Sequence, residues 1–117
     1  MRDRATMEEE HATNSAQDAL KQALDRMWVQ FLPTLTERVA ILESAAAARH
    51  SVEAAEEAHA AAHKLAGALG TFGLIEGTAL AREAEGLCAA ARGLDEEGAK
   101  RLAEIAVRLR NLIENRP

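Results

Sequence analysis

Two histidines in an alanine-rich stretch, His59 and His63, are the residues most suited to chemistry. A neutral imidazole is a competent nucleophile near neutral pH. Two imidazoles four residues apart also have a spacing that metal ligands use on a helix. However, Ala60 stands where a zinc-protease helix needs a glutamate, and the sequence has no Cys-x-x-Cys motif. We therefore expect no native metal site here.

Small residues surround His63 on one flank of the expected helix. Gly67 and Gly70 lie four and seven residues after it, so they share its side, whereas Lys64 projects about 100° away. Each glycine inside a helix costs about 1 kcal/mol relative to alanine. Ala66, Gly67 and Gly70 either form a docking surface that lets a partner approach the imidazole closely, or admit a neighbouring helix of the same fold. Spacing alone leaves both readings open.

A long helix is the first of the elements that must position this stretch. Apolar residues recur at alternating steps of three and four from Leu20 to Ala46. Pro33 lies inside this pattern and predicts a kink or a restart, and the stripe resumes in phase after it, which favours the kink. Residues 1–15 are polar without a sustained period. We expect them to form a flexible arm, with the folded domain over residues 16–117.

Three shorter amphipathic helices follow, separated by short turns. The second is expected between Ser51, a residue type that caps helix N-termini, and Gly73, which supplies a helix stop. The third is predicted over about residues 75–92, and the fourth from the N-cap Asp95 to near Asn115. Four such segments bury their apolar faces most simply as an all-α, antiparallel, up-and-down four-helix bundle.

Composition excludes several classes of protein. The 117 residues carry a formal net charge of −5 and no basic patch with interleaved aromatics, which argues against nucleic acid as a partner. No stretch is long and apolar enough for a membrane span or a secretory signal. A single cysteine suits a reducing compartment, so we expect a cytoplasmic protein. No strand precedes the glycine run after His63, so we expect no nucleotide cradle and no kinase activity of its own.

The segment His63-Lys64-Leu65-Ala66-Gly67, followed by Gly73, resembles the signature of histidine-containing phosphotransfer (HPt) domains. That signature is His-x-x-Lys-Gly with a second glycine six residues further on, and the resemblance extends over about residues 17–115. It implies that His63 is a phosphoryl acceptor on an exposed face of the second helix. The implied partners are receiver domains, hybrid histidine kinases or both, with Mg²⁺ supplied by the receiver and no cofactor bound by this chain. We expect a monomer.

One position departs from this signature. Ala66 stands where the family usually has lysine, three residues after the histidine. Stabilisation of the phosphate then falls to Lys64, to His59 or to the partner. The departure also keeps a second function open, in which a degenerate relative serves as a helical interaction or scaffold module without phosphate chemistry.

Overall fold

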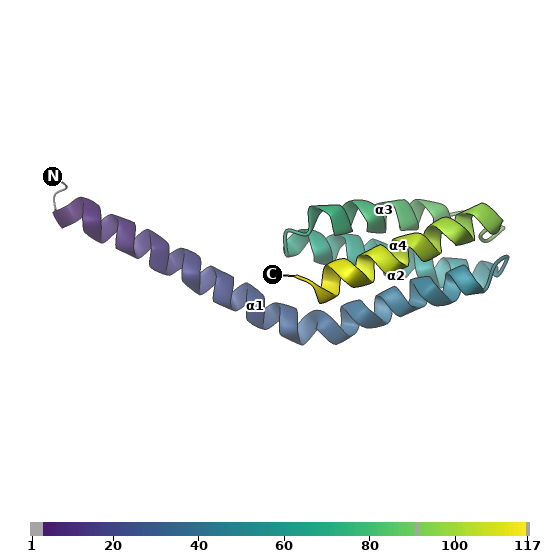
Figure 1. Cartoon of the computed structure of the whole chain (residues 1–117), viewed down its shortest axis with the longest axis horizontal. Coiled ribbons are helices and arrows are strands. Elements are labelled where there is room, and N and C mark those ends of the chain that lie inside the picture. Colours follow the sequence, from purple (N-terminus) through teal and green to yellow (C-terminus); the bar gives the residue numbers. More distant parts are fainter. Residues whose placement is uncertain (1–3, 91, 117) are drawn as a thin grey trace. The chain divides into compact units, whose positions relative to one another are not determined.

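The computed structural model describes residues 4–90 and 92–116, which form four helices and no strand (Figure 1). They are α1 (Arg4–Ala47), α2 (Val52–Thr71), α3 (Ile75–Cys88) and α4 (Glu96–Glu114). The predicted all-α, four-helix fold is confirmed. The chain divides into two compact units, Met1–Phe31 and Leu32–Pro117. None of the helices in the described part of the chain is long and apolar enough to cross a membrane.

The first unit contains the N-terminal part of α1. The predicted arm, residues 1–15, is helical from Arg4 onward, and residues 1–3 lie outside the described part. Its alanines, glutamates and methionine are strong helix formers, and they extend a helix that already exists downstream more easily than they would start one. The two units divide after Phe31 rather than after residue 15. Whether residues 1–15 act as an arm stays a prediction.

Helix α1 continues through Pro33 without a break, so the alternative of a restart is excluded. Proline removes one intrahelical hydrogen bond and crowds the preceding turn. Pro33 is exposed, which leaves room for its ring on the solvent side.

The second unit is the bundle that carries the histidines. In Figure 1, α2, α3 and α4 lie alongside one another. Its interior combines leucines with many alanines, and alanine lets helix backbones approach closely because its side chain is short. The fully buried residues include Leu35, Val39 and Leu42 from α1, Ala58, Ala62, Leu65 and Leu69 from α2, Ala81 and Ala84 from α3, and Leu102, Ile105 and Leu109 from α4.

Both predicted N-caps are present. The Ser51 hydroxyl accepts a hydrogen bond from the Ala54 N–H (3.1 Å), and the Asp95 carboxylate accepts one from the Gly98 N–H (2.7 Å). Each bond satisfies a donor that the first turn of a helix leaves unpaired. The starts of α2 and α4 are thereby fixed.

A left-handed residue ends α2 beside the turn into α3. Gly73 has φ +73°, and its N–H donates to the Gly70 carbonyl (3.1 Å). The following Leu74 N–H donates to the Leu69 carbonyl (2.9 Å). This pair of bonds is a Schellman motif, which glycine adopts without a steric penalty. It sets the geometry of the α2–α3 hairpin.

Helix α3 ends at Cys88, earlier than the predicted end near residue 92. Alanine propensity favours a longer helix, but a tertiary contact prevails. The His50 N–H donates to the Leu94 carbonyl (3.1 Å), and Leu94 is buried. Gly93 has φ +78°, and a Cβ there would lie 3.1 Å from the His50 carbonyl carbon. The chain must therefore leave the helix before this contact.

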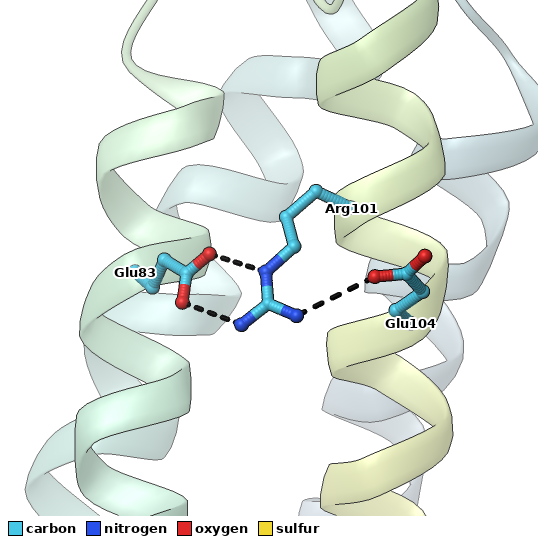
Figure 2. Close-up of polar contacts among 3 residues, drawn as sticks. All are labelled: Glu83, Arg101 and Glu104. Carbon is cyan, nitrogen blue, oxygen red and sulfur yellow. Dashed lines mark hydrogen bonds and ion pairs between the residues drawn. The ribbon is translucent and has the colours of Figure 1, made fainter.

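Two arginines of α4 bind glutamates of α3. Arg101 donates to both carboxylate oxygens of Glu83, with 2.8 Å between Nη2 and Oε1, and also to Glu104 (Figure 2). Arg108 binds both oxygens of Glu76, at 2.8 and 3.0 Å. These hydrogen bonds lower the pKa of Glu76 and of Glu83. They align α3 against α4 at positions seven residues apart on each helix.

The lowered pKa values predict a stability that depends on pH. A carboxylate whose pKa falls on folding stabilises the protein above its unfolded pKa near 4.5, and this contribution disappears as pH falls through the folded value. Because these pairs are exposed, the effect is modest. We expect the double variant Glu76→Gln/Glu83→Gln to melt a few degrees lower at pH 7 and to lose less stability than the wild type between pH 5 and about pH 3. Thermal melts by circular dichroism test this; parallel losses in both proteins would contradict it.

Candidate functional site

His63 projects into solvent from the middle of α2. Its side chain is 75% exposed, whereas the neighbouring residues Ala62 and Leu65 are fully buried. The buried face holds the helix rigidly, and a step of about 100° along the helix brings the next side chain to the surface. The imidazole is therefore displayed on a fixed backbone.

Glu85 of α3 holds one side of this imidazole. The distance between His63 Nδ1 and Glu85 Oε2 is 2.8 Å, and the Glu85 side chain is about one-third exposed. An ionised carboxylate only accepts hydrogen bonds, so Nδ1 carries the proton and donates it. In the neutral ring, Nε2 then has a free lone pair. The contact thus selects the tautomer in which Nε2 is able to act as a nucleophile.

Sequence reasoning missed Glu85, although the hairpin contains a signal for it. Residues of two antiparallel helices lie opposite each other when they are equally far from the turn. His63 and Glu85 are each eleven residues from Leu74 at the α2–α3 turn. Counting outward from the predicted stop at Gly73 could therefore have identified the region of α3 that faces His63.

Close contacts fix this register between α2 and α3. The Thr78 hydroxyl lies 3.4 Å from the Ala66 carbonyl and 3.2 Å from the Leu74 carbonyl, within donating distance of both. Gly77 is buried, and a Cβ at this position would lie 3.0 Å from the Leu69 side chain. The glycine that permits close helix packing is therefore Gly77 on α3, which the sequence pattern did not single out.

Gly67 and Gly70 leave open space instead. A Cβ at Gly67 would meet no atom within 4 Å outside its own helix, and one at Gly70 would make ordinary contact with Thr78 Oγ1 at 3.6 Å. Both glycines are exposed, and so is Gly86 next to Glu85, where a Cβ would also meet nothing. The sequence left two interpretations of these glycines open, a docking surface or close packing of a neighbouring helix. At Gly67 no described residue of a neighbouring helix lies close enough for the second interpretation.

Ala66 does not belong to the exposed flank. It is 6% exposed, because it faces α3 and its carbonyl lies against Thr78. The helix turns this position toward the core, and its predicted contribution to a docking surface stays a prediction.

Lys64 and His59 lie on different sides of α2. Lys64 is exposed and lines a hollow with residues of α1, including Glu37 and Ile41, away from Glu85. His59 is half-buried and lines a hollow with Cys88 at the end of α3. Burial raises the pKa of the Cys88 thiol to about 11, so this thiol stays protonated at neutral pH.

Among the residues that the structure describes, no three His, Cys, Asp or Glu side chains form a set that could hold a metal ion.

The open glycines predict that bulk near His63 affects access more than folding. We expect Gly67→Leu to slow phosphoryl transfer from a protein partner about tenfold or more, because the leucine occupies the approach to the imidazole, and to raise the melting temperature slightly, because leucine has a higher helix propensity than glycine. Gly77→Leu is the matched control and should reverse this pattern, since it crowds Leu69 inside the bundle. Transfer rates and thermal melts of both variants check the prediction. Equal losses of stability in the two would contradict it.

A comparison with protein-family models finds a match to the Hpt domain over residues 26–116. No curated protein and no solved structure gives a significant match to the chain. The matched residues include all of α2, α3 and α4, with the exposed histidine and its glutamate. The chain belongs to the Hpt domain family, whose helical bundles serve phosphotransfer in two-component signalling.

Proposed function

We propose that this chain is a phosphorelay intermediate in which Nε2 of His63 accepts a phosphoryl group and passes it on. The donor is an aspartyl-phosphate of a receiver domain or a histidine kinase, and the recipient is a receiver domain. The observation that carries the proposal is the 2.8 Å contact of Nδ1 with Glu85, on a ring that is otherwise exposed. This contact leaves the outward nitrogen as the reactive one.

The transfer needs no base from this chain. The Nε2 lone pair attacks the phosphorus of an aspartyl-phosphate, the N–P bond forms, and the P–O bond breaks with its electrons leaving on the aspartate. Nδ1 keeps its proton, and Glu85 stabilises the positive charge that the ring gains. In the onward step an aspartate oxygen attacks the phosphorus, and the electron pair of the P–N bond returns to Nε2.

The surface around His63 supports docking of such a partner. Phosphoryl transfer depends mainly on in-line positioning and on neutralising charge. Gly67, Gly70 and Gly86 keep the neighbourhood of the imidazole free of bulky side chains. Mg²⁺ would be supplied by the receiver domain, as the resemblance implies. We propose that the chain acts as a monomer in the cytoplasm, a compartment that suits a single free thiol.

A scaffold without phosphate chemistry is the alternative, and one experiment separates the two. The full chain is incubated with ³²P-labelled receiver domain and Mg²⁺, and the label is tested for stability in acid and base. We expect acid-labile, base-stable label on the chain, as a phosphoramidate requires. Failure to take label from cognate receivers and from a small phosphoramidate donor would overturn the proposal in favour of the scaffold.

A further inference from the structure

We propose that Arg82 of α3 binds the phosphoryl group on His63 and supplies the positive charge that the motif itself lacks. The inference rests on the proposed function and adds a phosphate-binding residue to the site. It follows from the position of Arg82 on α3 and from the absence of a hydrogen bond or ion pair between Arg82 and any residue that the structure describes.

Arg82 lies on the stripe of α3 that faces α2. Thr78, Arg82 and Glu85 follow one another at steps of four and three residues, so they share one side of the helix. Both ends of this stripe touch α2: Thr78 contacts the Ala66 carbonyl at 3.4 Å, and Glu85 contacts His63 at 2.8 Å.

The hairpin register gives Arg82 a position opposite Ala66. Thr78 lies opposite Gly70, four residues from Leu74 on either side, and Glu85 lies opposite His63. Between these pairs, Arg82 and Ala66 are each eight residues from Leu74. Ala66 contributes no charge, but an arginine side chain at the facing position is long enough to extend toward a phosphoryl group on His63, and the open space at Gly67 leaves room for it.

Arg82 is available to bind an anion. The arginines Arg101, Arg108 and Arg110 each bind a glutamate through two hydrogen bonds. Arg82 is exposed, and among the residues that the structure describes it takes part in no ion pair or hydrogen bond.

Phosphorylation creates a need for this charge. A phosphoryl group brings up to two negative charges to a ring that Glu85 already holds from the other side. Lys64 lines the hollow toward α1 and not the α2–α3 side. The planar guanidinium of arginine can donate two parallel hydrogen bonds to phosphate oxygens, whereas a lysine ammonium acts as a point charge.

The test uses the full chain and phosphoramidate, a small donor that needs no partner protein. In this reaction the P–N bond to ammonia breaks as the bond to His63 Nε2 forms, and the ammonia leaves as ammonium. Wild type, Arg82→Gln, Arg82→Lys and the matched control Lys64→Gln are followed by ³¹P NMR. The readouts are the loading rate and the pH titration of the phosphoryl group.

We expect Arg82→Gln to load about threefold to tenfold more slowly and to raise the second pKa of the phosphoryl group by about half a unit, because the dianion loses a cation. Arg82→Lys should restore part of both effects, and Lys64→Gln should match the wild type. Molar salt should shrink the differences. Equal loading rates and equal titrations in Arg82→Gln and Lys64→Gln would overturn the role of Arg82 and leave the proposed function intact. A wild-type chain that takes no phosphoryl group would overturn the proposed function as well.

Discussion

Replacing His63 by glutamine is expected to abolish acid-labile phosphorylation of the chain. The substitution removes the nucleophilic nitrogen, and no other described side chain combines an exposed imidazole with a carboxylate partner. Because the His63 side chain is 75% exposed, the change in unfolding free energy should stay within about 0.5 kcal/mol. Labelling by a phosphorylated receiver and by phosphoramidate measures the loss of phosphorylation. A thermal melt of the same preparation measures the change in stability.

His59→Gln is the matched control, one helical turn before His63. It replaces the same residue type on the same helix, and His59 is half-buried beside Cys88 without the Glu85 contact. It should retain the label. Label that persists in His63→Gln and disappears in His59→Gln would transfer the acceptor role to His59.

Glu85→Gln is expected to slow loading from phosphoramidate by about tenfold to a hundredfold. A carboxylate accepts only, so it enforces the proton on Nδ1, whereas an amide can also donate to Nδ1 and leave the proton on Nε2. Losing a group that orients a reactive histidine carries penalties of this size or larger in other enzymes. The variant also loses the negative charge that stabilises the ring in the transfer. Glu85→Ala should behave in the same way, because it removes the acceptor altogether.

A second readout separates this role from a purely structural one. In the wild type, ¹⁵N NMR of the imidazole should show the proton on Nδ1, and in Glu85→Ala the population should move toward Nε2–H. Glu83→Gln, two residues away on α3, breaks the pair with Arg101 and serves as the control: it should lower stability slightly and leave loading unchanged. Full-speed loading of Glu85→Gln with an unchanged tautomer would exclude the role of Glu85.

Local signals in the sequence predicted the framework of the site. Ser51, Asp95 and Gly73 act within a few residues of themselves, as caps and as a left-handed stop, so their effect is visible in the sequence. The apolar stripe likewise indicates which side of α2 is buried. Exposure of His63 follows directly from its step past Ala62.

Features that depend on neighbouring elements could not be predicted in this way. Glu85 reaches His63 only through the register of the hairpin, and the stripe that contains Thr78 and Arg82 becomes visible with the same register. Helix α3 ends at Cys88 because the loop contact of His50 with Leu94 outweighs alanine propensity.

The isomer of the phosphohistidine tests the central claim most directly. Chain labelled with ¹⁵N in its histidines is loaded with phosphoramidate, and coupling between phosphorus and nitrogen identifies the bonded atom. The contact of Nδ1 with Glu85 predicts phosphorus on Nε2 of His63, with Nδ1 still protonated. Phosphorus on Nδ1, or on a residue other than His63, would contradict it.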